Sequence, residues 1–98
     1  MGVTLVVVHY RTREPLARLL ASLRAARPAP IREIVIVNNS GEPLDDLAAT
    51  SGLPTRVLSP GENLGYARGV NLGIRAATEE DVLILNPEVV EVDQVTDT

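Results

Sequence analysis

Short polar segments follow four apolar runs in this chain, and their side chains are of types that bind phosphates and metal ions. They include one guanidinium, several amides and one carboxylate: Arg11, Asn38, Asn39, Asn63, Asn86 and Glu88. An anionic ligand can use Arg11 together with the amino end of a helix predicted over 65–77. A divalent cation can bridge Glu88 to the phosphates of that ligand, because hard cations take oxygen ligands.

Each of these segments also has a purely structural interpretation. His9, the only histidine, is either a structural residue or a ligand contact, and neither a cysteine nor a second histidine accompanies it for a metal site. The segment 38–41 is either an ordinary turn or part of a site. Glu88 is either a loop carboxylate or a metal ligand. The chain contains neither GxGxxG nor the P-loop motif GxxxxGK[ST], which argues against nucleotide sites of those two types.

The elements that must position these residues follow from the apolar pattern. We predict strands at 3–10, 31–37, 55–59 and 81–86, and helices at 14–26, 43–52 and 65–77. Apolar runs without polar alternation are typical of strands buried on both faces of a parallel sheet, and the weaker run at 55–59 is expected to be an edge strand. In the first helix the leucines form one stripe, at Leu16, Leu19, Leu20 and Leu23.

Strands that alternate with helices predict an α/β fold with right-handed crossovers. We expect a Rossmann-like open parallel sheet of about four strands in the order 3-2-1-4, with helices on both faces. This order reverses between the first and last strands, and ligands bind beyond the carboxyl ends of strands at such a reversal. We therefore expect Arg11, Asn38 and Glu88 to share one crevice there.

Glycines recur every four residues in the helix predicted over 65–77, at Gly65, Gly69 and Gly73. They lie along one flank of an apolar arc, which is formed by Ala67, Val70, Ile74 and Ala77. Each glycine costs roughly 0.5–1 kcal/mol relative to alanine in a helix interior. We expect a compensating close approach of the helix backbone, either to the sheet or to a ligand.

Composition limits the class of protein. With 98 residues and 45% apolar residues, the chain is expected to form one small domain with a single core. The net charge of -4 argues against a nucleic-acid partner. Cysteine is absent, and no apolar run reaches the ~20 residues that a transmembrane helix needs. We expect a soluble, cytoplasmic protein.

Four motifs together resemble a known family. VVVHYR, IVIVNNSG, NLGYARGVNLGIRAA and DVLILNPE occur in the order and at the distances found in the amino-terminal half of family 2 glycosyltransferases, most closely the rhamnosyltransferase-like members. The resemblance covers roughly residues 3 to 92. It implies the nucleotide-binding half of a GT-A fold. It also implies a nucleotide-diphosphate sugar, a UDP- or dTDP-sugar, as ligand and Mg²⁺ or Mn²⁺ as cofactor.

The resemblance also assigns residues. It implies a nucleotide-sugar site that includes His9, Tyr10, Arg11, Asn38, Asn63, Gly65, Tyr66, Gly69, Asn71 and Asn86. Asn38 stands where the family usually has an aspartate that hydrogen-bonds the base or ribose. Glu88 stands where the metal-binding motif usually ends in aspartate, and is the expected metal ligand. No residue matches the general base that the family carries in its acceptor-binding half.

We therefore expect 1–98 to be a single nucleotide-sugar-binding domain, truncated before the acceptor half. It would serve glycosyl transfer, hexosyl or rhamnosyl, without activity of its own as an isolated chain. The alternative is a catalytically inactive nucleotide-binding or protein-interaction module of the same fold. Because the missing half would cover part of the sheet, we also expect the chain to self-associate.

Overall fold

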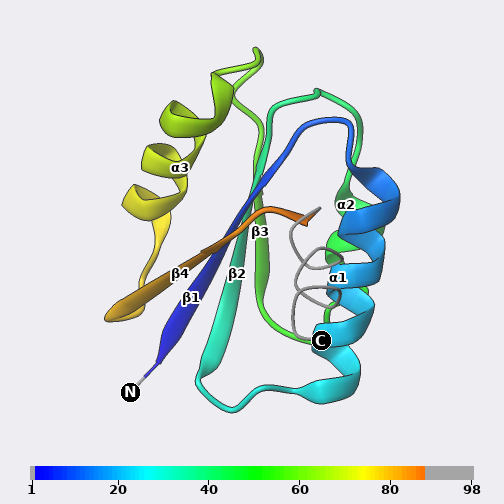
Figure 1. The fold of residues 1–98 in the computed structure, drawn as a ribbon, viewed down its shortest axis with the longest axis vertical. Helices are drawn as coiled ribbons and strands as arrows, with labels where there is room; N and C mark the ends of the chain where they lie inside the picture. Colours follow the sequence, from blue (N-terminus) through cyan, green and yellow to red (C-terminus); the bar gives the residue numbers. More distant parts are fainter. Residues whose placement is uncertain (1, 88–98) are drawn as a thin grey trace, which may run out of the picture.

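The computed structural model describes residues 2–87, which form a four-stranded parallel sheet with helices on both faces (Figure 1). The strands are β1 (Val3–His9), β2 (Ile31–Asn38), β3 (Thr55–Leu58) and β4 (Asp81–Leu85), and the helices are α1 (Arg13–Ala26), α2 (Asp45–Ala48) and α3 (Gly65–Ala76). The strand order is β3-β2-β1-β4, and every pair is parallel. The predicted α/β class and the predicted order are confirmed.

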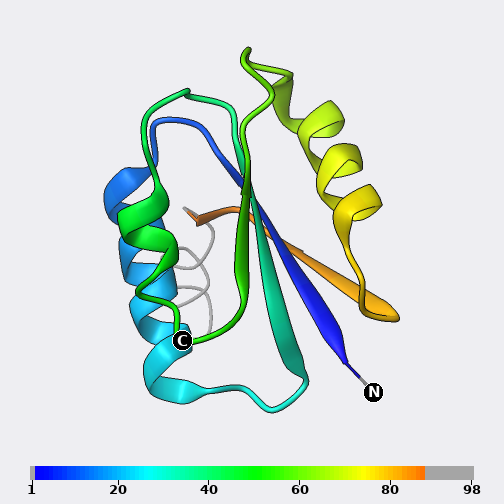
Figure 2. The ribbon, with the colours of Figure 1, turned by 180° about the vertical axis from the view of Figure 1, so that it is seen from behind.

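Different helices cover the two faces of the sheet. Opposite views show α1 and α2 on one face and α3 on the other (Figure 1, Figure 2). Side chains alternate along a strand, so Leu5 and Val7 of β1 join the main core with α1, while Val6 and Val8 lie against α3. Because one strand serves two packed faces, β1 has no polar residue between Leu5 and Val8.

The predicted leucine stripe forms the buried side of α1. All four leucines are buried, namely Leu16, Leu19, Leu20 and Leu23. The helix ends at Ala26 and is capped by Arg27, which takes a left-handed conformation with φ 46° and donates its N–H to the Leu23 carbonyl at 2.8 Å. Two prolines, Pro28 and Pro30, follow and prevent the helix from continuing. Within residues 2–87, α1 is the longest helix, and none combines the length and apolar content that crossing a bilayer requires.

The second helix is shorter than predicted. The expected range was 43–52, whereas α2 covers only Asp45–Ala48. The hydroxyl of Thr50 donates to the Leu47 carbonyl at 2.7 Å, and the hydroxyl of Ser51 accepts the Leu53 N–H at 3.1 Å. Serine and threonine hydroxyls that bond to nearby backbone groups compete with helical hydrogen bonds, which explains the early end.

Two glycines of α3 pack directly on the sheet. Gly69 and Gly73 are buried, and a Cβ built on Gly69 would lie 3.1 Å from Cγ1 of Val8. A Cβ on Gly73 would overlap with Val6. Gly65 differs, because nothing lies near its Cβ position and its φ of 80° is what favours glycine. The close approach that the glycines predicted is therefore made to the sheet, at two of the three positions.

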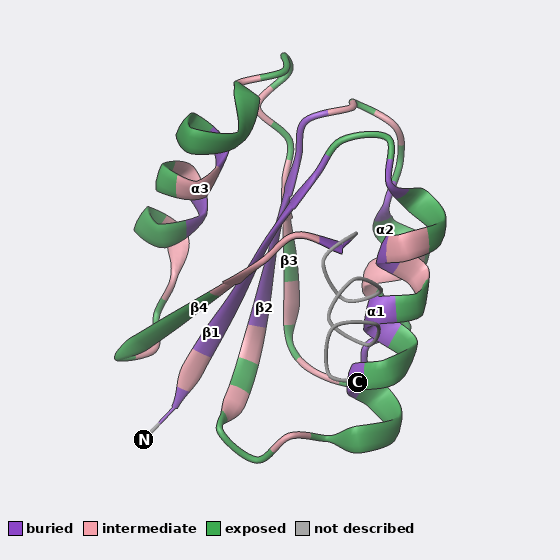
Figure 3. Ribbon diagram, viewed as in Figure 1, coloured by how far each residue is buried: buried purple, intermediate pink, exposed green. Residues whose placement is uncertain are grey.

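The strand β4 is only partly covered (Figure 3). Val82 and Leu83 are exposed, Leu83 by 44%, so the prediction that this strand is buried on both faces is wrong. The reason is that α3 packs chiefly on β1 and β2. Ile74 of α3 is also exposed by 41%, so the predicted apolar arc turns partly to solvent. At the other end of the sheet, β3 is an edge strand as predicted.

Candidate nucleotide-sugar site

A hollow of about 200 Å³ opens between the carboxyl end of β1 and the first turn of α3. Its lining comes from both elements and from the end of β2: Val8, Tyr10, Asn39, Asn63, Gly65 and Tyr66. Four of these residues, Tyr10, Asn63, Gly65 and Tyr66, were assigned to the nucleotide-sugar site from the sequence. The structure thus brings together residues that lie more than fifty positions apart in the chain.

The entry to α3 is shaped by Asn63 and Gly65. The side-chain oxygen of Asn63 accepts the Gly65 N–H at 2.9 Å, which closes a tight turn just before the helix. Gly65 takes the left-handed φ of 80° that this turn requires. Next to it, Tyr66 is exposed by 53%, and Tyr10 across the hollow is exposed by 43%. Both tyrosines of the chain therefore line the same hollow.

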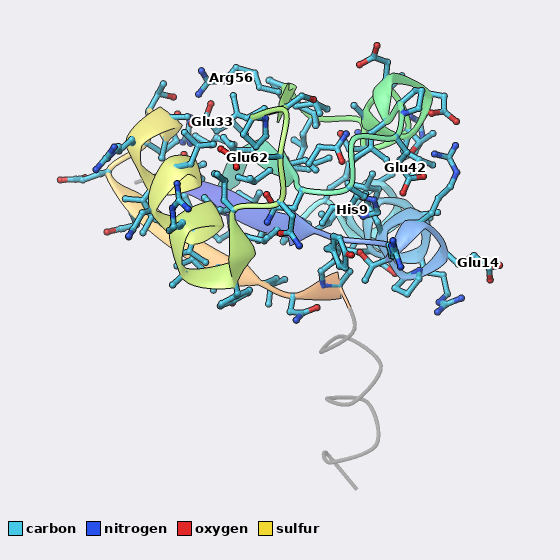
Figure 4. All side chains as sticks on the ribbon, turned by 90° about the horizontal axis from the view of Figure 1, so that it is seen from above. His9, Glu14, Glu33, Glu42, Arg56 and Glu62 are labelled. Carbon is cyan, nitrogen blue, oxygen red and sulfur yellow. The ribbon has the colours of Figure 1, made fainter. Side chains whose placement is uncertain are left out.

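His9 points to the other face of the sheet. It is fully buried, with Nδ1 2.9 Å from the hydroxyl of Thr12 and Nε2 2.9 Å from Oε1 of Glu42. Seen from above, His9 and Glu42 lie together on the side of α1, away from α3 (Figure 4). Both ring nitrogens have protein partners, so the ring ties β1 to the loop after β2.

Glu42 is the charged member of this network. The hydrogen bond from the His9 ring holds the pKa of the Glu42 carboxyl below its ordinary value, although desolvation acts in the opposite direction. Attraction to His9, a hydrogen bond from Ser40 and the Arg13 guanidinium 3.6 Å away also lower the pKa. Arg13 makes a further ion pair with Asp46 at 2.5 Å. A chain of polar contacts thus links β1, the 38–42 loop and both helices of this face.

The amide of Asn38 builds the turn that carries Glu42. Its oxygen accepts the N–H groups of Ser40 and Gly41, each at 3.2 Å, and its nitrogen donates to the Glu42 carbonyl at 2.6 Å. Asn38 is buried and lies at the end of β2 on the face that its neighbour Asn39 does not share. The expectation that Asn38 contacts the base or ribose stays a prediction.

Arg11 lies at the rim, beside the hollow. Its guanidinium carbon is 5.1 Å from the centroid of the Tyr10 ring, an attractive cation–π contact. Its backbone takes a left-handed φ of 54°, which is uncommon outside glycine. Its N–H donates to the Ser40 hydroxyl at 3.3 Å. The Arg11 side chain lies over the Tyr10 ring, and Arg11 is exposed.

The other assigned residues lie away from the hollow. Gly69 lies on the side of α3 that faces the sheet. Asn71 lines a separate hollow of about 210 Å³ on the outer side of that helix, with Arg68 and Arg75. Asn86 follows β4 and is half-buried. Glu88 lies outside the described residues, so the predicted crevice shared by Arg11, Asn38 and Glu88 stays a prediction. Within 2–87, no three or more histidine, cysteine, aspartate or glutamate side chains are grouped to hold a metal.

Sequence reasoning placed Asn39 only among the polar residues of the rim, yet it lines the hollow directly. Alternation of side chains along β2 could have identified Asn39 only once the face of Ile36 was known, and the structure places Ile36 on the α1 face. Two steps further, Asn38 shares that face, which leaves Asn39 for the face of α3.

A comparison with protein families agrees with the α/β fold. The family model described as "Glycosyl transferase family 2" matches residues 4–87, from β1 to just beyond β4. A search of curated proteins found no match. The matched segment includes β1 from its second residue, the 38–42 loop, all of α3 and the residues that line the hollow. On this match, which covers most of the chain, the protein belongs to glycosyl transferase family 2.

Proposed function

We propose that this domain binds a nucleotide-diphosphate sugar at the carboxyl edge of its sheet, as the donor for glycosyl transfer. The observation that carries the proposal is the hollow that Tyr10, Asn63, Gly65 and Tyr66 line together. In open α/β sheets, ligands bind outside the carboxyl ends of strands where the strand order reverses, and here it reverses next to β1. Family membership independently supports glycosyl transfer.

The size of the hollow suggests which part of the donor enters it. Its volume of 200 Å³ is below the range of about 300–1,000 Å³ that is usual for whole small-molecule ligands. A single planar base would suit it, because Tyr10 and Tyr66 offer ring surfaces and stacking of a base on an aromatic side chain is favourable by about 1–3 kcal/mol. The ribose and diphosphate would then lie along the open rim towards Arg11.

We propose UDP- or dTDP-sugars as donors, with rhamnosyl or hexosyl transfer as the reaction. Three groups are suited to the negative charge of the diphosphate: the exposed Arg11 guanidinium, the amide of Asn63 and the N–H groups of the first turn of α3. We assign no carboxylate in the described part of the rim as the general base. We therefore propose that other residues hold the acceptor.

We propose Mg²⁺ or Mn²⁺ as cofactor, with Glu88 as its protein ligand. The donor set fits a hard cation, because one carboxylate and the diphosphate oxygens are all oxygen ligands and Mg²⁺ is commonly bound in that way. When bound, the ion offsets the negative charge that builds on the leaving diphosphate. Of the described residues that the sequence assigns to the site, Asn86 lies nearest to Glu88 in sequence and would help to orient the segment.

The experiment is a titration of UDP-glucose, UDP-rhamnose and dTDP-rhamnose into the purified chain, with and without Mn²⁺, followed by calorimetry. We expect binding that Mn²⁺ strengthens, that Tyr66→Ala weakens by at least tenfold, and that Glu88→Gln makes independent of Mn²⁺. The matched control is Ile74→Ala, which removes an exposed apolar side chain from the same helix away from the hollow. Absence of binding at millimolar donor would refute the proposal, and metal-independent binding without transfer would favour the inactive module.

We also propose that a second copy of the chain covers the open side of β4. Val82 and Leu83 are exposed there, and Asp81 is the only charged residue of the strand. An antiparallel pair of β4 strands centred on Leu83 would place Asp81 opposite Leu85, so that the two aspartates lie at opposite ends. Edge strands with so few charges readily pair with another chain.

A further inference from the structure

We infer that Asn39 is a positioning residue that fixes the first turn of α3 over the hollow, and that donor binding depends on it through that turn. The dependence on donor binding rests on the function proposed above. The positioning itself rests only on contacts within the described structure, so the two parts can be tested separately.

The side chain of Asn39 spans from the end of β2 to the start of α3. Its oxygen accepts the N–H of Leu64 at 3.3 Å, and its nitrogen donates to the carbonyl of Gly65 at 3.2 Å. Leu64 and Gly65 are the residues at which α3 begins. The amide of Asn39 therefore bonds to both an N–H group and a carbonyl group at the start of α3. The residue is only 5% exposed.

The backbone of Asn39 is fixed as well. Its N–H donates to the His9 carbonyl at 2.8 Å, which continues the pairing of β1 with β2 by one residue. The anchor of the amide is thus the central strand pair of the sheet. Through Asn39, the position of Gly65 and of the adjacent Tyr66 is set relative to Tyr10 on the end of β1.

Gly69 supplies the room that the amide needs. A Cβ at Gly69 would lie 3.2 Å from Nδ2 of Asn39, in addition to its contact with Val8. Any larger residue at 69 would press on the amide that holds the helix entry. This gives one glycine of α3 a role in the site that is distinct from packing alone.

Asn39 acts indirectly, because both of its polar atoms are already engaged with α3. An aspartate would keep the acceptor for the Leu64 N–H but lose the donor for the Gly65 carbonyl, and would place two oxygens in contact. The structure therefore favours an amide at 39, and the groups that meet the donor are its neighbours Asn63, Gly65 and Tyr66.

The first test is amide hydrogen exchange of Leu64 in the wild type and in Asn39→Ala. We expect exchange at Leu64 to become about tenfold faster in the variant, as loss of a hydrogen bond of about 1.4 kcal/mol implies. Thr78→Ala is the matched control, because it removes a side-chain hydrogen bond to Glu33 just beyond the opposite end of α3. Unchanged protection of Leu64 in a folded Asn39→Ala protein would overturn the inference.

The second test is the affinity for the UDP- or dTDP-sugar that the wild type binds. We expect Asn39→Ala to weaken it about tenfold and Thr78→Ala to leave it within about twofold. If the wild type binds neither sugar, the proposed function fails, while the exchange experiment still decides the positioning role. If Asn39→Ala binds as the wild type does, the link to donor binding is wrong.

Asn39→Asp provides a variant that keeps the shape of the side chain. Once protonated, its carboxyl gains an O–H that can donate to the Gly65 carbonyl, so it imitates the amide. Relative to the wild type at each pH, protection of Leu64 and donor affinity should recover as the pH falls from about 8 towards about 4, the usual pKa region of aspartate. A variant that stays equally impaired, or equally unimpaired, across this range would contradict the inference.

Discussion

Gly73 of α3 lies so close to Val6 of β1 that a methyl group on Gly73 would overlap with the valine side chain. Helix and strand meet here without an intervening side chain on the helix. The preceding turn of α3 repeats the arrangement, with Gly69 against Val8. A Cβ built on Gly69 would lie farther from Val8 than one built on Gly73 would lie from Val6. Contact between a glycine backbone and a β-branched side chain is thus the means by which α3 is held near the sheet.

We predict that Gly73→Ala destabilises the fold. Overpacking costs typically about 1–3 kcal/mol, and the better helix propensity of alanine returns up to about 1 kcal/mol, so a net loss of about 1–2 kcal/mol is expected. Urea denaturation measures it. Gly69→Ala is the comparison, with a smaller expected loss because its nearest contact would be 3.1 Å. Equal stability of Gly73→Ala and the wild type would show that α3 can move away from the sheet without cost.

A second prediction concerns Glu33, which fastens the far end of α3 to the sheet. Its carboxylate accepts hydrogen bonds from the hydroxyls of Thr4 and Thr78, at 2.5 and 2.7 Å, and Arg56 lies 3.6 Å away (Figure 4). Burial acts to raise the pKa of Glu33, but the hydrogen bonds from Thr4 and Thr78 together with the Arg56 charge lower it below its ordinary value.

A folded-state pKa below the unfolded value means that the ionised carboxylate stabilises the fold. This contribution is complete above about pH 4.5 and is lost as the pH falls through the lower, folded-state pKa. Glu33→Gln should lower stability at pH 7 by roughly 1–2 kcal/mol and should flatten the dependence below pH 4.5. Thermal unfolding between about pH 3 and 7 measures both, with the exposed Glu14→Gln as control. If the stability of Glu33→Gln fell with pH in parallel with that of the wild type, the pH dependence could not be assigned to Glu33.

A third prediction concerns Thr12, which precedes α1 but makes no side-chain cap to it. Its hydroxyl is instead 2.9 Å from Nδ1 of the fully buried His9. Thr12→Val should cost about 1–3 kcal/mol, because it leaves a buried ring nitrogen without a partner. Thr12→Ser keeps the hydroxyl and should cost clearly less in the same chemical denaturation experiment. If serine and valine were equally harmful, loss of packing rather than the hydrogen bond would be responsible.

The fourth prediction addresses self-association through β4. Leu83→Arg places a charge at the centre of the proposed strand pair and should shift the protein towards monomer in light scattering at high concentration. Arg75→Ala, on the outer side of α3, is the control and should leave the mass unchanged. A wild-type protein that remains monomeric at these concentrations would eliminate the pairing.

Much of the fold was accessible from the sequence because its signals are local and periodic. The stripe of Leu16 and its three partners identified α1, and the continuous apolar runs identified a parallel sheet and its order. The extent of cover over β4 was not accessible, since it depends on where α3 settles. That position is decided by contacts of Gly69 and Gly73 with β1, which spacing alone did not distinguish from a ligand contact.

The candidate site was accessible in part for a similar reason. Tyr10, Asn63, Gly65 and Tyr66 fall into one hollow because they follow the carboxyl end of a strand or begin a helix, and both positions are set by topology. The roles of Asn38 and Asn39 are decided by which face each side chain takes at the end of β2. A shift of one residue in the strand end would exchange them, and the sequence leaves that register open.

The glycine contact of α3 also determines how the helix can respond to a ligand. A helix that meets its sheet through interlocking side chains can adjust by local changes of rotamer, whereas Gly69 and Gly73 have no rotamers to change. Any displacement at the Gly65 end must then travel along the rigid helix, whose 12 residues span roughly 18 Å at about 1.5 Å per residue, before it reaches Thr78 and Glu33. Occupancy of the hollow should accordingly be detectable at the opposite end of the sheet, as altered chemical shifts at Thr78.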